Sequence, residues 1–184
     1  ARSFAMITGD PRGTTSQDRV RGFVERLLEG GIRRAAIEEA PGLSSYDGAA
    51  AAVLALFERR DRPRRAALFK INDIMAMGAI ALLRGRLGLT ATRDMLVDGF
   101  DGVLEATREA YRVTPVRQPI DDMVEQTLAL MHLDDPDTPI ARGVDMPLPA
   151  QLVWGETTPR PPGFASAEAR AATPRRRGPA RSRN

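Results

Sequence analysis

Short apolar runs alternate with segments of helical periodicity through the first part of the chain. Each run is mainly apolar and is bounded by turn-forming or polar residues, which is the pattern of a buried strand. Between and after these runs, apolar residues recur three or four positions apart, as on one face of a helix. The pattern predicts strands at 3–9, 33–40, 66–72 and 94–100, and helices within 10–31 and at 44–60, 73–88 and 102–112.

Strands that alternate with helices favour an α/β fold, in which a parallel β-sheet of at least four strands is flanked by helices. In such sheets, ligands bind beyond the carboxyl ends of the strands. Here those ends carry turn-forming or polar residues, and the third is the pair Asn72-Asp73, at the junction of a strand and a helix. Two interpretations of this pair are open: it caps the helix, or it forms the edge of a ligand site.

The regular alternation stops after the fourth predicted helix. Residues 113–119 predict a short extended segment, and residues 120–132 predict a further helix. A loop follows at 133–143, and the proline-interrupted stretch at 144–158 reads as extended edge structure. Two such segments after a complete α/β unit indicate a chain that crosses to a neighbouring lobe and returns.

The chain has 184 residues, enough for one domain with a substantial core, and we expect residues 1–158 to form it. It begins at Ala1 rather than Met, which suggests a fragment of a longer protein. No stretch approaches the roughly 18 apolar residues of a membrane span. Cysteine is absent, and the single histidine, His132, argues against histidine-based catalysis. We therefore expect no metal and no cofactor.

Basic residues concentrate at the C-terminal end of the chain. Residues 170–184 hold six Arg and no acid, so the rest of the chain carries −3 of the total net charge of +3. This end lacks the apolar residues needed to fold, and we expect residues 159–184 to form a disordered Arg/Pro-rich tail. A weak contact of the tail with nucleic-acid phosphates stays open as an alternative role.

Motifs of catalysis are missing from the sequence. There is no G-x-S-x-G nucleophile elbow, no phosphate-binding P-loop and no histidine cluster with metal-ligand spacing. Asp98, Asp101 and Glu105 lie near one another, but acids without a second motif are a weak sign of an active site. The sequence therefore favours a binding protein over an enzyme.

Five segments resemble, in order and in rough spacing, motifs of the ligand-binding core of the lactose-repressor (LacI) family of bacterial transcription regulators. The first three also occur in periplasmic sugar-binding proteins of the same fold, whereas the last two favour the regulators. The segments are DRVRGF (18–23), FKINDIMAMGAI (69–80), VDGFDG (97–102), VTPVRQP (113–119) and MPLPAQLVWGETT (146–158).

The resemblance implies a periplasmic-binding-protein-like clamp of two lobes, which closes on a small-molecule effector, often a sugar, in a cytoplasmic homodimer. A helix-turn-helix domain that precedes the clamp binds operator DNA. This chain would hold most of the C-terminal lobe and the crossing segment, at about 114–140, and we expect the DNA-binding domain to be absent from it. Two alternatives stay open: a periplasmic sugar-binding protein of an ABC transporter, and an interaction module that binds no ligand.

Three residues match the effector contacts that the family makes from this lobe. Arg19 matches the arginine of R-x-x-G-F, whose forked donors reach hydroxyls or a carboxylate. Asn72 matches the asparagine of N-D and offers a donor and an acceptor, and Asp101 matches the aspartate of G-F-D, which accepts from hydroxyls. The resemblance therefore implies a sugar or related polyol as effector.

Structural roles compete with these assignments. Arg19 could be a solvated helix residue, and Asp101 could cap the helix after it. Asp73 suits the cap and first-turn anion of its own helix better than a ligand contact. An apolar stripe on the third predicted helix is expected to divide between the core and the dimer interface: Met75, Met77, Ile80 and Leu83.

Three positions depart from the motifs of the family. Leu43 stands where the family commonly has an aromatic residue that stacks on a sugar. Asp98 places a carboxylate within a strand expected to be buried, and Gly155 replaces an arginine. These departures bear on the identity of the effector and not on the fold.

Overall fold

The computed structural model describes residues 3–58, 65–131, 143 and 145–162. Its centre is a six-stranded sheet in the order β2-β1-β3-β4-β5-β6. The first five strands are parallel, whereas β6 runs antiparallel to β5. The strands are β1 (Ser3–Thr8), β2 (Ile37–Pro41), β3 (Arg65–Lys70), β4 (Leu96–Asp101), β5 (Thr114–Arg117) and β6 (Gln151–Leu152).

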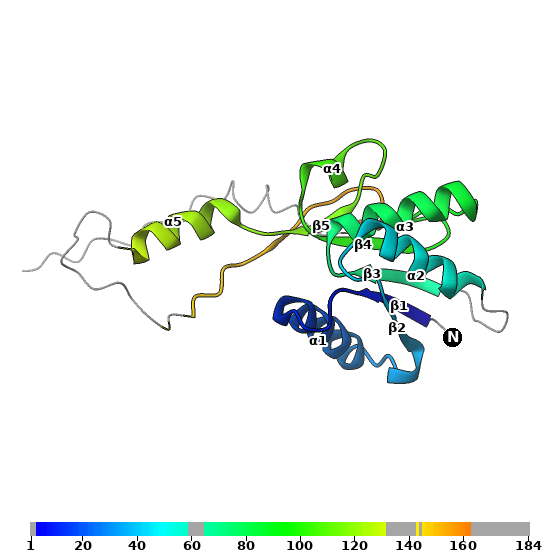
Figure 1. Ribbon diagram of the computed structural model, residues 1–184, viewed down its shortest axis with the longest axis horizontal. Coiled ribbons are helices and arrows are strands. Elements are labelled where there is room, and N and C mark those ends of the chain that lie inside the picture. Colours follow the sequence, from blue (N-terminus) through cyan, green and yellow to red (C-terminus); the bar gives the residue numbers. More distant parts are fainter. Residues whose placement is uncertain (1–2, 59–64, 132–142, 144, 163–184) are drawn as a thin grey trace, which may run out of the picture.

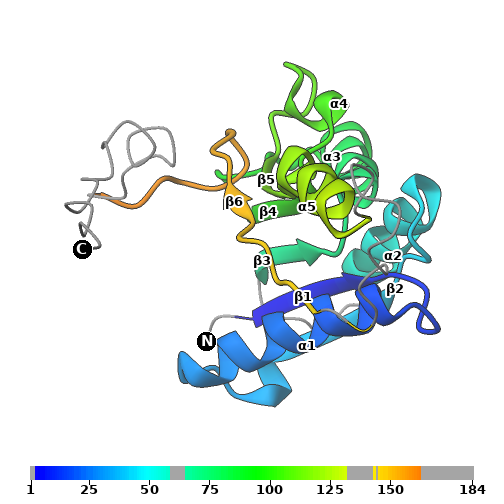
Figure 2. The same ribbon diagram turned by 90° about the vertical axis from the view of Figure 1, so that its left-hand side faces the viewer.

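Helices cover both faces of this sheet (Figure 1, Figure 2). One face is covered by α1, and α2 and α3 lie side by side on the other. The connections between parallel strands pass through these helices, as such a sheet requires. The helices are α1 (Thr14–Glu29), α2 (Tyr46–Glu58), α3 (Asp73–Arg86), α4 (Leu104–Thr107) and α5 (Ile120–Leu130), with a short 3-10 helix at Arg34–Ala36.

The core between the sheet and the α2–α3 pair is closely packed. The two helices meet at Gly78, where a Cβ atom would lie 2.2 Å from the carbonyl oxygen of Tyr46, so a larger residue would push them apart. The expected stripe of α3 belongs mainly to this core. Three of its residues are at most 2% exposed and the fourth is partly buried: Met75, Ile80 and Leu83, and then Met77.

Strand β3 sends alternate side chains to the two faces. Phe69 stacks on Phe23 of α1, with ring centroids 3.9 Å apart and planes within 12°. This aromatic pair fastens α1 to its face of the sheet. The residues on either side of Phe69, Leu68 and Lys70, are both buried, and Lys70 is 0% exposed.

Two segments far apart in sequence join along β5 and β6. The N–H of Thr114 donates to the hydroxyl of Thr157 at 2.9 Å, and the N–H of Gly155 donates to the hydroxyl of Thr114 at 3.1 Å. A Cβ atom on Gly155 would lie 2.2 Å from the carbonyl oxygens of Arg112 and Val113. Close backbone packing in this chain therefore favours glycine at position 155.

The fold class expected from the sequence is confirmed, and β1 and β3 pair in parallel. Three expected elements are markedly shorter than predicted: residues 34–36 of the first form a 3-10 helix, the chain of the second turns toward β5, and prolines interrupt the third. They are the strand at 33–40, which begins at Ile37, the helix at 102–112, which ends at Thr107, and the stretch at 144–158, which pairs only at Gln151–Leu152.

Helix α5 extends away from the sheet beyond the end of β5 (Figure 1). None of its residues is buried. Its apolar residues recur at helical spacing, so they form one exposed stripe rather than a random scatter. The members of this stripe are 42–54% exposed: Ile120, Met123, Val124, Leu128 and Met131.

Parts of the chain that carried sequence-based expectations lie outside the described residues. They are His132, the loop expected at 133–143 apart from Gly143, and the expected tail beyond residue 162. The division into a domain at 1–158 and a tail at 159–184 therefore stays a prediction. Within the described ranges, no helix has the length and apolar character needed to span a bilayer.

Candidate functional site

Arg19 projects from α1 to the carboxyl ends of β3 and β4. Its Nη1 donates to the carbonyl oxygen of Ile71 at 2.5 Å, and its Nη2 donates to the carboxylate of Asp101 at 3.0 Å. The guanidinium also stacks on Phe100, with Cζ 3.9 Å from the ring centroid. The side chain is only 15% exposed, so Arg19 is not a solvated helix residue.

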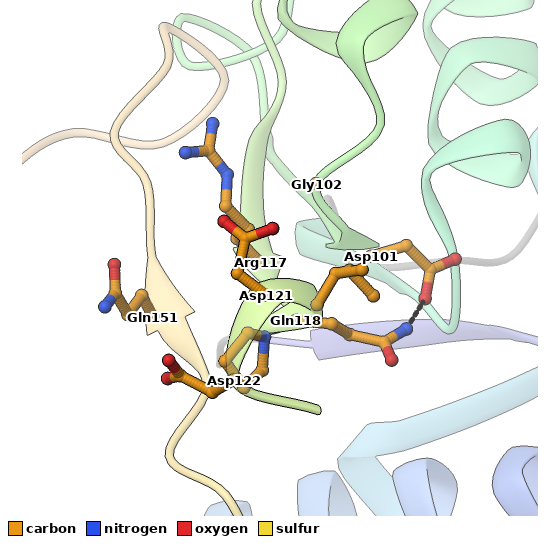
Figure 3. Close-up of a pocket in the computed structure, with 9 residues that line it drawn as sticks. Asp101, Gly102, Arg117, Gln118, Asp121, Asp122 and Gln151 are labelled. Carbon is orange, nitrogen blue, oxygen red and sulfur yellow. Dashed lines mark hydrogen bonds between the residues drawn. The ribbon is translucent and has the colours of Figure 1, made fainter. Parts of the chain in front are cut away.

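Asp101 ends β4 and accepts hydrogen bonds from two neighbouring elements. Its Oδ1 accepts from Arg19 of α1 and, at 2.6 Å, from Nε2 of Gln118 beyond β5 (Figure 3). The N–H of Gln118 also donates to the carbonyl oxygen of Asp101 at 3.2 Å. Gln118 was missed in the sequence, although it is a polar residue just past the end of a predicted extended segment.

Asn72 adjoins this cluster through the backbone, because Arg19 binds the carbonyl of the preceding residue, Ile71. The side-chain oxygen of Asn72 accepts from the N–H of Met75 at 2.9 Å, so Asn72 is the N-cap of α3. Asp73 is the acidic residue of the first turn of α3, as expected, but the expectation that it caps this helix is wrong. The cap occupies the amide oxygen of Asn72, which leaves its NH₂ group as the donor that it can offer a ligand.

Asp73 begins α3 but supports the turn that precedes α4. Its side chain is buried, and Oδ2 accepts from the N–H groups of Gly102 and Val103 at 2.7 and 2.8 Å, at the start of α4. Burial raises the pKa of Asp73 to about 6, although these two hydrogen bonds favour the charged form. The carboxylate fits because Gly99 has no side chain: a Cβ atom there would lie 2.2 Å from Oδ1.

Lys70 and Asp98 place two ionisable side chains in the sheet beside this site. The Nζ of Lys70 donates to the carbonyl oxygen of Leu68 at 3.0 Å, and the N–H of Lys70 donates to Oδ1 of Asp98 at 3.0 Å. Burial lowers the pKa of Lys70 and raises that of Asp98, and the attraction between the two charges opposes both shifts. Asp98, the carboxylate that departs from the apolar pattern of β4, thus lies beside Lys70. The sequence pattern did not reveal this pairing.

A cavity of about 360 Å³ opens between the end of β4 and the start of α5. Asp101 and Gln118 form one side of it, as Figure 3 shows. The lining holds three carboxylates, from Asp101, Asp121 and Asp122, against the single guanidinium of Arg117. Such a lining suits a ligand that donates hydrogen bonds and repels an anionic one. Among the residues that the structure describes, no cluster of three or more acids or histidines could hold a metal ion.

The sequence of this chain is similar to a family of binding domains and to named transcription regulators. The periplasmic binding protein-like domain matches residues 1–158. The HTH-type transcriptional regulator DegA of Bacillus subtilis is 32% identical over 124 residues, which cover 66% of this chain and 35% of DegA. The HTH-type transcriptional regulator CelR of Thermobifida fusca is 28% identical over 130 residues, covering 71% and 37%. These relatives are named as transcription regulators, which fits a protein that is not an enzyme and does not favour the transporter alternative.

Solved structures give the same result. A LacI transcriptional regulator from a Rhodococcus species has a TM-score of 0.73 and 25% identity, over 85% of this chain and 56% of that one. A complex of the regulator CelR with cellobiose has a TM-score of 0.70 and 26% identity, over 85% and 46%. The chain thus spans little more than a third of these two curated relatives and about half of the solved structures. The chain belongs to the periplasmic binding protein-like domain family and corresponds to the C-terminal part of LacI-type transcription regulators.

Proposed function

We propose that this chain is the effector-sensing and dimerising part of a LacI-type transcription regulator, and that its effector is a sugar or related polyol. The observation that supports this most strongly is the hydrogen-bonded set of Arg19, Asp101 and Gln118 at the carboxyl edge of the sheet. This is the edge at which α/β sheets bind ligands. In the complete cytoplasmic regulator, a helix-turn-helix domain outside this chain binds operator DNA.

The chemistry of the site favours a neutral effector with several hydroxyls. Arg19 already binds Ile71 and Asp101, so it is not an unpaired cation that would attract an anion. Asp101 engages both Arg19 and Gln118 through Oδ1, which leaves Oδ2 to accept from a ligand hydroxyl. The NH₂ group of Asn72 donates to such a hydroxyl. Cellobiose, the ligand in the CelR complex, is therefore the first probe to test.

The exposed stripe of α5 fits a mechanism in which two lobes close on the effector. Apolar side chains such as Ile120 and Val124 would pack against the second lobe, to which the chain crosses after β5. An effector that binds both lobes stabilises the closed clamp. It can shift the regulator between two states only by its difference in affinity for them.

Dimerisation is proposed through the start of α3 and α4. Ile74 is 47% and Leu104 65% exposed, and the bond from Val103 to Asp73 brings these two helix starts together. Leu104→Arg is expected to convert dimers to monomers in sedimentation analysis of the full-length regulator, because charge is disfavoured at the centre of an interface. Leu28→Arg, at a 43% exposed residue of α1, should leave the mass unchanged. A dimer that persists in Leu104→Arg would contradict this interface.

Asn72 is expected to contribute to both ligand binding and stability. In the full-length regulator, Asn72→Ala should weaken cellobiose binding by about 1–3 kcal/mol, because a ligand hydroxyl loses its donor. It should also lower the free energy of unfolding by about 1 kcal/mol, because α3 loses the acceptor for the N–H of Met75. Calorimetric titration and thermal unfolding measure the two effects.

Asn72→Ser separates these roles, because a serine hydroxyl can cap the helix but cannot supply the NH₂ donors. We expect the serine variant to regain most of the stability and to bind cellobiose as poorly as Asn72→Ala. Full affinity in the serine variant would show that Asn72 is only a cap. A wild-type protein that binds no neutral sugar would favour an interaction module without a small ligand.

A further inference from the structure

Asp73 lies next to the candidate site without lining its cavity. Its side chain is 0% exposed and sits between the start of α3 and the turn that follows β4. Its Oδ2 accepts hydrogen bonds from the N–H groups of two residues of that turn, Gly102 and Val103. The turn begins at Asp101, the residue whose carboxylate binds Arg19 and Gln118.

The backbone of this turn needs support from its surroundings. Asp101 has a φ of 115° and Gly102 a φ of 80°, so two successive residues occupy positive φ, and the first is not a glycine. Such a conformation is sparsely populated and persists only where neighbouring groups hold it. The helix after the turn has four residues, and its N-cap, Val103, has no side chain that could bond the free amides. Asp73 of α3 instead binds the amides of the turn itself, those of Gly102 and Val103.

We propose that Asp73 is a positioning residue for effector binding: by holding the amides of Gly102 and Val103, its carboxylate directs Asp101 toward Arg19 and Gln118. The direction of a side chain is set largely by its backbone, so a turn that loosens also turns the Asp101 carboxylate. The consequence for affinity rests on the proposed function. The structural link from Asp73 through Asp101 to Gln118 does not depend on that function.

The strength of this hold depends on the protonation of Asp73. An ionised carboxylate accepts shorter and stronger hydrogen bonds from N–H groups than a neutral one does. The charged groups that face Asp73 are Arg19 from α1, which favours ionisation, and Asp98 and Asp101 from β4, which oppose it. Burial raises the pKa of Asp73 to about 6. The hydrogen bonds from Gly102 and Val103 to its carboxylate therefore weaken as the pH falls through that value.

Gln118 reports on this link without any effector, because its side-chain amide donates to Asp101. In the ¹⁵N-labelled 184-residue chain, we expect the N–H signals of Gly102 and Val103 and the side-chain amide signal of Gln118 to shift together, with a midpoint near pH 6. Asp73→Asn should abolish the shared midpoint and displace the Gln118 signal at neutral pH. Asp47→Asn, the same change at an exposed first-turn residue of α2, should alter none of the three.

The proposal is overturned if the Gln118 signal does not change while the signals of Gly102 and Val103 titrate. Asp73 would then stabilise only the turn and would not orient the Asp101 carboxylate. The wild-type titration needs no substitution, so it decides the matter even if the variants unfold. In the full-length regulator, Asp73→Asn should weaken cellobiose binding about tenfold at neutral pH. Coupled titration without cellobiose binding by the wild type would leave the positioning role intact and count against the proposed function.

Discussion

Lys70→Met is expected to lower the free energy of unfolding by about 3 kcal/mol, at the low end for a buried pair, because it leaves the partly buried Asp98 carboxylate without an opposing charge. Asp98→Asn should also lower the free energy of unfolding. The side chain of Lys70 is 0% exposed and would lose the carboxylate whose charge opposes its own. Chemical denaturation at neutral pH measures both changes. The effect is large because a single buried charge costs far more than a matched pair.

The double variant Lys70→Met/Asp98→Asn is the matched control. Asparagine keeps an oxygen that accepts from the N–H of residue 70, as Oδ1 of Asp98 does at 3.0 Å. We expect the double variant to equal the wild type in stability or to exceed it by about 1–4 kcal/mol, because both desolvation penalties disappear. If Lys70→Met alone stabilises the protein, then the two groups do not depend on each other and the pairing is refuted.

Arg19→Ala should weaken cellobiose binding by the full-length regulator about a hundredfold, equivalent to roughly 2.7 kcal/mol. The guanidinium joins α1 to Ile71, Asp101 and the ring of Phe100, so its loss frees Asp101 from one of its two donors. The loss of these contacts should also lower the free energy of unfolding by about 2–3 kcal/mol. Calorimetric titration and urea unfolding test both expectations.

Arg21→Ala provides a control on the same helix, because Arg21 forms an exposed ion pair with Asp18 at 2.7 Å. Its loss should change stability by only about 0.5 kcal/mol and leave binding intact. Arg19→Lys retains the charge but lacks the planar fork that reaches Ile71 and Asp101 together, so we expect an intermediate affinity. Equal affinities for Arg19→Ala and Arg21→Ala would remove Arg19 from the site.

The sequence allowed the parallel sheet to be predicted because its strands are short, apolar and separated by helices of clear periodicity. It did not allow the extent of α4 to be predicted, because the apolar spacing of residues 102–112 continues past the point where the helix ends at Thr107. Beyond that point, the N–H of Val113 bonds to the carbonyl of Ala106, and the chain turns toward β5. Tertiary contacts override helical spacing there.

The candidate site was foreseen only in part, because side-chain contacts between strand ends depend on three-dimensional placement. The resemblance places Arg19 and Asp101 among the contacts of one effector, and the bond between them is consistent with this, although their role in binding stays a proposal. Gln118 escaped notice because the crossing segment brings it to Asp101 only in the folded chain. The cap was assigned to Asp73 because either residue of the pair has a suitable oxygen, and only the backbone geometry at Asn72 decides between them.

The burial of Lys70 also determines how the folded chain reacts with covalent reagents. Lys70 is its only lysine, and none of its surface is accessible to solvent. Acylating dyes and amine cross-linkers require an exposed, neutral amine, so the folded body offers them no lysine to modify. A molecule in which β3 has come away from the sheet does offer one. Lysine acylation in this chain thus marks the opened population and not the native surface.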